Sequence, residues 1–79
     1  MFTLNIITPI SQRTVAVSWL ELETDYGSLI IQKGHRPLMA SLKALSEIKF
    51  ETDQQLVEIV GIVGGIAEVS RDSVMIVVG

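Results

Sequence analysis

Apolar and polar residues alternate along most of this sequence, with the period of two that is typical of β-strands. The first residues show it clearly, because Phe2, Leu4 and Ile6 are separated by single polar residues. A strand would carry all three on one face. The segment from Glu47 to Glu51 alternates in the same way. Both segments are therefore predicted to be strands with one face toward a core.

Two further segments predict strands with defined faces. In Thr14 to Leu22, the residues Val15, Val17 and Trp19 are expected on one face. The run Leu29-Ile30-Ile31 is apolar throughout. Because neighbours in a strand point to opposite faces, at least half of this run should belong to the core, and the rest could form a surface patch for a partner.

Residues typical of turns separate these strands from one another and from three later strands. The turn segments are Thr8-Pro9, Thr24 to Gly27, Lys33 to Pro37, Thr52 to Gln55 and Ser70 to Ser73. The later strands are expected at Leu56 to Val63, Ile66 to Val69 and Val74 to Val78. Many short strands at close spacing favour a sandwich or a barrel. We expect an all-β fold in which residues 1–79 form one domain.

Two segments do not follow the simple alternation. Leu38, Leu42 and Leu45 fall at helical spacing, so periodicity alone predicts a short helix there. The pair Gly64-Gly65 interrupts a strand pattern. Such a pair suggests a bulge or a close approach of another backbone segment.

Composition narrows the classes of protein that the chain could be. With 79 residues, no cysteine, and 48% hydrophobic against 19% charged residues, stability must come from apolar burial rather than from disulfides. The net charge of −3 and the single, scattered basic residues disfavour nucleic acid as a partner. No signal peptide is visible, and the most apolar stretch, Leu56 to Val69, contains two charges and three glycines and is too short to span a membrane.

No residue pattern predicts catalysis, a metal site or a bound cofactor. His35 is the single histidine, and no serine has the Gly-x-Ser-x-Gly surroundings of a hydrolase nucleophile. The neighbours of His35, Gly34 and Pro37, indicate that His35 lies in a loop and stabilises a local turn. The later glycines match no phosphate-binding motif and lie between strands, and the carboxylates lack the spacing of metal ligands. Glu21, Glu23 and Asp25 are interpreted as a solvated acidic face.

Three segments resemble the epsilon subunits of ATP synthases. The segment Gly27-Ser-Leu-Ile-Ile-Gln-Lys-Gly-His-Arg-Pro-Leu38 is similar to their signature Gly-Glu-Phe-Gly-Ile-Leu-Pro-Gly-His-Ala-Pro-Leu. The segment Val63-Gly-Gly-Ile-Ala-Glu-Val69 resembles Ser-Gly-Gly-Phe-Ala-Glu-Val, and the opening Leu4-x-Ile-x-Thr-Pro9 also fits. The sequence departs from the pattern at Ser28, Ile30, Lys33 and Ala44-Leu45, where the family has glutamate, glycine, proline and a Pro-Gly turn.

The resemblance implies a ten-stranded β-sandwich of two sheets, the N-terminal domain of such a subunit. It also implies a strand for part of Leu38 to Leu45, against the helical periodicity. Family members typically continue into a C-terminal pair of helices, whereas this sequence ends at Gly79, so we expect either a truncated or a naturally short member.

The resemblance further implies a function without bond chemistry. The family's domain is a non-catalytic rotor part of the central stalk in a proton-translocating F-type ATP synthase. It joins the gamma subunit to the c ring and is peripheral to the membrane, on the cytoplasmic face of the bacterial inner membrane. Carried over by position, the gamma-facing residues would be Thr8, His35 and Ala40, and the c-ring loop would be Tyr26, Gly27, Ser28 and Leu29. The alternative is an unrelated β-sandwich interaction module whose similar motifs arise from turn chemistry, and an enzyme is a more distant third.

Overall fold

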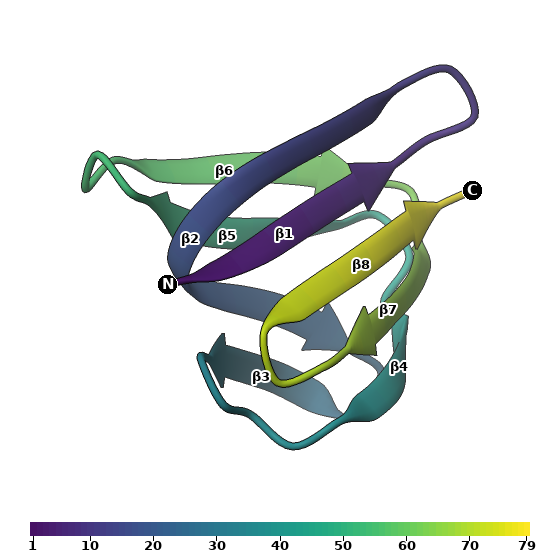
Figure 1. Ribbon diagram of the computed structural model, residues 1–79. Coiled ribbons are helices and arrows are strands. Elements are labelled where there is room, and N and C mark those ends of the chain that lie inside the picture. Colours follow the sequence, from purple (N-terminus) through teal and green to yellow (C-terminus); the bar gives the residue numbers. More distant parts are fainter.

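The computed structural model describes residues 1–79, and every regular element in it is a β-strand (Figure 1). The eight strands are β1 (Phe2–Ile7), β2 (Gln12–Thr24), β3 (Gly27–Gln32), β4 (Leu38–Leu42), β5 (Ser46–Thr52), β6 (Val57–Ile62), β7 (Gly65–Val69) and β8 (Ser73–Val78). The expected all-β class is therefore confirmed.

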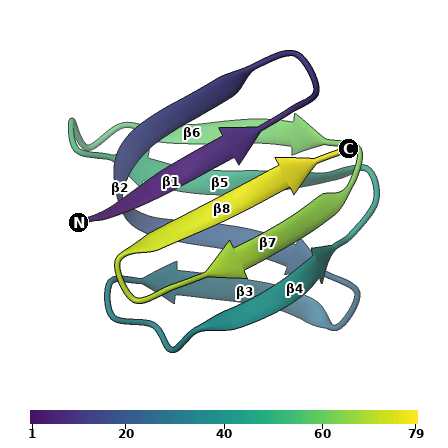
Figure 2. The ribbon, with the colours of Figure 1, turned by 45° about the vertical axis from the view of Figure 1, so that its right-hand side comes forward.

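The strands form two layers that share β2 (Figure 2). One layer contains β1, β8, β7 and β4, with β1 and β8 parallel and the other neighbours antiparallel. The other layer contains β3, β5 and β6, and the second half of β2 lies between β3 and β5. The first half of β2 pairs with β1, so this one strand continues from one layer into the other. The expected count of ten strands is corrected to eight, partly because this 13-residue strand serves both layers.

A β-bulge divides β2 at the point where it changes layers. Val17 pairs with Thr52 and Trp19 pairs with Glu51, so Ser18 is an extra residue on its strand. The extra residue reverses the alternation, and Val17 and Leu20 are both fully buried while Trp19 lies on the outer face. The prediction that Trp19 shares the face of Val17 was wrong for this reason. A bulge also bends a strand and increases its twist, which suits a strand that crosses between layers.

The space between the layers is filled by a single apolar core. Fifteen buried hydrophobic residues pack together there, with Phe50, Leu4, Leu20, Leu22, Ile31, Ile48 and Ile76 the largest of those that are fully buried. The predicted inward face of β1 is confirmed, because Phe2, Leu4 and Ile6 are all buried. In β3, Ile31 is buried and Leu29 packs on the core, while Ile30 is 59% exposed. The apolar run thus divides between core and surface as expected.

The segment with helical leucine spacing forms a strand. β4 pairs with β7 over five residues, from Leu38 with Val69 to Leu42 with Gly65. The helix predicted from periodicity was wrong, and the strand implied by the family resemblance is confirmed. Pairing with β7 supplies the hydrogen bonds that a short helix would have had to form alone, and isolated short helices are marginal in water.

Two backbone positions restrict the choice of residue. Gly65 has a φ of +155°, and a Cβ placed on it would clash with the carbonyl oxygen of Val77 on β8. The close backbone approach predicted for the glycine pair is thus confirmed. Leu45, in the β4–β5 turn, has a φ of +54° although it is not a glycine, and its side chain is 84% exposed. An L-residue in this left-handed region is strained by contact of its Cβ with the backbone.

Replacing Gly65 should destabilise the fold. Gly65→Ala combines a left-handed φ with a contact that only backbone movement could relieve, so we expect the free energy of unfolding to fall by about 2 kcal/mol or more. The control is Gly61→Ala in β6, where an added Cβ meets no atom within 4 Å. It should leave stability unchanged or raise it by up to about 1 kcal/mol. Urea denaturation measures both, and equal effects of the two variants would contradict the close approach.

Replacing Leu45 by glycine should stabilise the protein. The left-handed conformation costs an L-residue about 1–2 kcal/mol, and glycine avoids this cost. Glycine also loses more conformational entropy on folding, which offsets about 0.4–1 kcal/mol of the gain. We expect Leu45→Gly to gain about 0.5–1 kcal/mol. Its neighbour Ala44 has no positive φ, so Ala44→Gly should lose a similar amount. Thermal unfolding of the two variants should therefore shift in opposite directions.

Candidate protein-binding surfaces

The segments that connect the strands gather at two opposite ends of the molecule (Figure 2). One end, named here the His35 end, holds the N-terminus, the loop 33–37 and the turns 53–56 and 70–72. The opposite end, named the Tyr26 end, holds the turns 8–11, 25–26, 43–45 and 63–64 and the C-terminus. The largest dimension of the molecule is 27 Å. A single small domain therefore presents two separate sets of loops.

The β2–β3 turn presents an aromatic side chain on a stiff support. Its strands pair over six residues, and Thr24 binds the turn twice, since its hydroxyl accepts from the Tyr26 amide at 3.1 Å and donates to the Gly27 carbonyl at 2.8 Å. The side chain of Tyr26 is fully exposed. Tyrosine combines a large apolar area with few rotatable bonds, which makes it effective in protein interfaces. The turn has the properties of a docking point.

The four residues predicted for the c ring differ in their positions. Tyr26, Gly27 and Ser28 are exposed at the turn, and the Ser28 hydroxyl donates to Glu23 at 2.9 Å. Leu29 instead pairs with Leu22 and packs on the core. A contact of these residues with a c ring stays a prediction, and Leu29 could support such a contact only from beneath.

His35 lies in a loop that is bound to the neighbouring turn. The Gly34 amide donates to the carbonyl of Arg71 at 2.9 Å, and the His35 amide donates to the carbonyl of Gln32 at 3.1 Å. The His35 Nδ1 lies 2.8 Å from the carbonyl oxygen of Arg36. A carbonyl can only accept, so Nδ1 carries the proton and Nε2 is left for another partner. The histidine thus stabilises its own loop, in line with the structural interpretation of the sequence.

The other two predicted gamma-facing residues lie elsewhere. Thr8 is in the β1–β2 turn at the Tyr26 end, where its hydroxyl accepts from the Ser11 amide at 3.0 Å. Ala40 pairs with Ala67 in the middle of β4 and is half-buried on the side toward the core. Thr8 and His35 are separated by the length of β8, about 20 Å for six residues. The fold does not bring the three residues into one cluster, and their contact with gamma stays a prediction.

The outer face of β4, β7 and β8 carries exposed apolar side chains. Met39, Ile66, Met75 and Val77 are between 41% and 69% exposed, and they form what we name the outer apolar patch. The register brings them together, because Ile66 pairs with Val77 and Glu68 lies between Met75 and Met39. An exposed patch of this kind on a small soluble domain often marks a protein interface.

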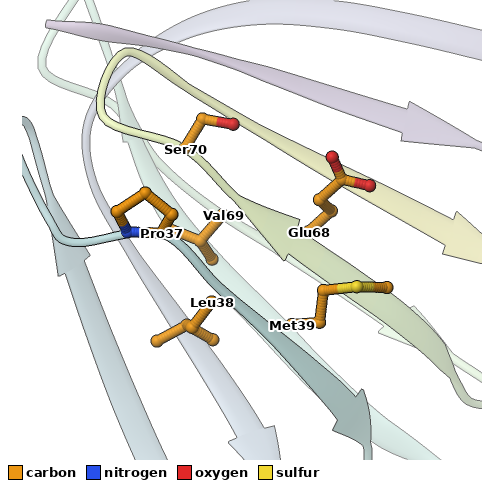
Figure 3. Close-up of a pocket in the computed structure, with 6 residues that line it drawn as sticks. All are labelled: Pro37, Leu38, Met39, Glu68, Val69 and Ser70. Atoms are coloured by element: carbon orange, nitrogen blue, oxygen red, sulfur yellow. The ribbon is translucent and has the colours of Figure 1, made fainter.

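A pocket opens beside this patch, at the His35 end (Figure 3). Its volume is about 360 Å³, and it is lined by Pro37, Leu38, Met39, Glu68, Val69 and Ser70. Pro37 and Ser70 lie at one side of the pocket, while Met39 and Glu68 lie at the other. Three of its six lining residues, Leu38, Met39 and Val69, are hydrophobic, and Glu68 and Ser70 are polar.

Three basic residues that sequence reading treated as scattered come together next to the pocket. Arg36 and Arg71 lie two residues beyond the last pair of the β4–β7 ladder, Leu38 with Val69, and Lys33 precedes the glycine that binds the Arg71 carbonyl. We name Lys33, Arg36 and Arg71 the basic cluster. The cluster could have been found only from the pairing of these two strands, which the sequence analysis did not predict and which brings positions 36 and 71 near each other.

The structure contains no arrangement of side chains that suggests catalysis. Thr52 is the one buried polar residue, so every charged group reaches solvent. No group of three or more histidine or acidic side chains could hold a metal ion. Glu21, Glu23 and Asp25 are all at least partly exposed, as expected for a solvated acidic face. The structure has no helix that is long and apolar enough to cross a membrane.

Comparison with known proteins assigns the chain to a family. A family model described as "ATP synthase, Delta/Epsilon chain, beta-sandwich domain" matches residues 1–79. The chain belongs to this family, which sets aside the alternative of an unrelated β-sandwich module. A search of curated proteins found no match.

Solved structures share the fold at low sequence identity. A chain of the Euglena gracilis mitochondrial ATP synthase, in a structure of OSCP/F1/c-ring, superposes with a TM-score of 0.83 at 21% identity. A chain of the Tetrahymena thermophila mitochondrial ATP synthase, in a structure of the central stalk and c-ring, gives 0.81 at 17% identity. Each match covers 98% of this chain but only 49% and 62% of the other chains. At such identity the likeness supports the fold, and this chain spans about half or somewhat more of their length.

Removing the Thr8 hydroxyl should cost stability, whereas removing the His35 ring should not. Thr8→Ala deletes the group that organises the β1–β2 turn, so we expect a loss of about 1 kcal/mol. Thr8→Ser keeps the hydroxyl and should recover most of it. His35→Ala removes one local hydrogen bond in an exposed loop and should change stability by less than about 0.5 kcal/mol. If denaturation curves showed that His35→Ala is less stable than Thr8→Ala, the loop that contains His35 would contribute more to stability than the β1–β2 turn.

Proposed function

We propose that this chain is a non-catalytic subunit of the central stalk of an F-type ATP synthase, where it joins the gamma subunit to the c ring. The match of the family model to residues 1–79 is the observation that carries the proposal. In this function the domain rotates with its two partners and couples rotation to ATP synthesis. It forms and breaks no bonds, and its contribution is the stiffness of its contacts.

The separation of the two ends supports contact with two partners. β3 runs from the Tyr26 turn to the loop that contains His35, about 20 Å along six residues. It is hydrogen-bonded to β2 along its length, and the core packs against its inner face. A load applied at one end of this hairpin is therefore transmitted through paired backbone rather than through a flexible loop.

The surface of the domain is large enough for both contacts. A standard interface buries about 800 Å² on each partner. Two such interfaces would together cover about a third of the 4886 Å² surface. The remaining surface stays in contact with solvent, which fits a domain whose outer faces carry both apolar patches and charges.

The proposed contacts follow the predicted residues. The c ring would meet the turn of Tyr26, Gly27 and Ser28, with Leu29 supporting it from the core. A gamma subunit that reaches both Thr8 and His35 would lie along the outer face of β1, β8, β7 and β4. It would then cover the outer apolar patch and pass over β4, which carries Ala40 on its core-facing side. The apolar residues of that patch supply the burial that a stable contact requires.

The proposed location is peripheral to the coupling membrane. The domain would be held there by the other subunits, on the side that carries the catalytic subunits. In a bacterium this is the cytoplasmic face of the inner membrane.

Truncating Tyr26 should weaken the c-ring contact without affecting folding. Its side chain is fully exposed and makes no hydrogen bond in the isolated domain. Buried in an interface, a tyrosine can contribute about 2 kcal/mol or more, so Tyr26→Ala should lower recovery of detergent-solubilised c ring by about tenfold or more. The control is Gln54→Ala in the β5–β6 turn, which is exposed at the opposite end.

The same co-purification tests the proposal as a whole. Tagged domains that carry Tyr26→Ala or Gln54→Ala should each recover the gamma subunit of the same organism. Failure of the wild-type domain to recover gamma would overturn the proposed function. If Tyr26→Ala and the wild type recovered the c ring equally, the c ring would contact a part of the domain other than this turn.

A further inference from the structure

The basic cluster is built by the fold and not by the local sequence. Lys33 and Arg36 lie in the β3–β4 loop, and Arg71 lies in the β7–β8 turn, 35 residues after Arg36. The hydrogen bond from the Gly34 amide to the Arg71 carbonyl, 2.9 Å long, ties the two segments together. All three side chains are exposed. Half of the six basic residues of an acidic chain therefore project from one corner of it.

No carboxylate of the protein forms an ion pair with this corner. The one ion pair within 4 Å joins Arg13 to Glu58, on β2 and β6. Asp72 is the acidic residue of the same turn, and it makes no ion pair with Arg71 or Arg36. Cations gathered without partners repel one another, and an anionic partner would relieve that repulsion. The corner thus has a charge suited to a negatively charged partner.

The adjoining pocket adds an apolar element to this charge. Arg36 precedes Pro37 and Arg71 follows Ser70 in the sequence, so both arginines are adjacent to the side of the pocket that Pro37 and Ser70 form. Glu68 lies at the opposite side, next to Met39. A segment that carries an apolar side chain next to a carboxylate would fit in one direction only, with its carboxylate toward the arginines and away from Glu68.

We propose that the pocket and the basic cluster bind an acidic segment of the gamma subunit, with an apolar side chain seated in the pocket between Pro37 and Met39. The inference rests on the proposed function, and it adds the chemistry of the partner surface. Arg36 and Arg71 hold carboxylates through paired N–H donors, a geometry that arginine provides and lysine does not. A long polyanion fits less well, because the cluster is small and the protein around it carries a net charge of −3.

Charge reversal tests the inference on the purified domain and gamma subunit. Arg36→Glu and Lys43→Glu change the net charge equally, and both positions are exposed residues of connecting loops. Arg36→Glu should weaken binding to gamma by about tenfold or more at 50 mM salt, and by much less at 0.5 M, where the screening length is only a few ångströms. Lys43→Glu, outside the cluster, should change the affinity less than about twofold. Arg71→Glu should behave as Arg36→Glu does.

A carbodiimide cross-link identifies the partner residue directly. The reagent joins an amine to a carboxylate only where the two are in contact, so Lys33 should become linked to an aspartate or glutamate of gamma. Lys33→Arg keeps the charge but removes the amine, and it should abolish that linked peptide while leaving affinity nearly unchanged.

The outcomes separate this inference from the proposed function. If gamma binds but Arg36→Glu and Lys43→Glu weaken it equally, the basic cluster is not the site, and the proposed function stands. If the wild-type domain does not bind gamma, both fail. Binding to phosphatidylglycerol vesicles that is lost in Arg36→Glu, with gamma binding unaffected by that substitution, would assign the cluster to a lipid surface and overturn the inference.

Discussion

The passage of β2 from one layer to the other is the constraint on which the rest of the fold depends. Its first half pairs with β1 and its second half with β3 and β5, so the two layers are joined by one continuous strand. The extra residue at Ser18 allows the crossing, and its hydroxyl donates to Glu51 at 2.6 Å. Arg13, from the first half of β2, reaches across to Glu58 on β6 and lies over the ring of Phe50. A strand that ended at the bulge would leave two open sheets with separate edges, which are prone to pairing with other chains.

Sequence patterns were reliable where the structure is local and failed where pairing between distant segments decides it. The alternation in β1 and β5 predicted their buried faces, because a period of two follows directly from strand geometry. Trp19 was assigned to the wrong face because no local signal marks Ser18 as a residue without a partner. Leu38 to Leu45 was ambiguous for a related reason. Its helical spacing is real, but the ladder with β7, far along the chain, determines its conformation.

The same division applies to the candidate surfaces. The turn that presents Tyr26 could be located from Asp25 and Gly27, because turn chemistry is encoded in neighbouring residues. The separation of Thr8 from His35 could not be read in this way, since both match the family pattern and only the parallel pairing of β1 with β8 shows that they lie at opposite ends. The basic cluster was missed because its members are far apart in the sequence. A motif identifies single positions, whereas a surface requires the register of the strands that carry them.

The two ends of the domain also differ in charge, and this bears on how it could be oriented between two partners. Glu23, Asp25 and Glu47 lie toward the Tyr26 end, with Lys43 and Lys49 as the basic residues beside them. The His35 end carries the three residues of the basic cluster, with Asp72 beside them and Asp53 in the turn 53–56. Opposite charges at opposite ends of a stiff body disfavour a reversed arrangement, because each end would then meet a partner surface of its own sign, and like charges in contact are costly. The apolar residues between the ends contribute buried area, which favours association but does not favour one orientation over the other. In such a domain, apolar contact provides the strength of attachment, and the distribution of charge determines which end meets which partner.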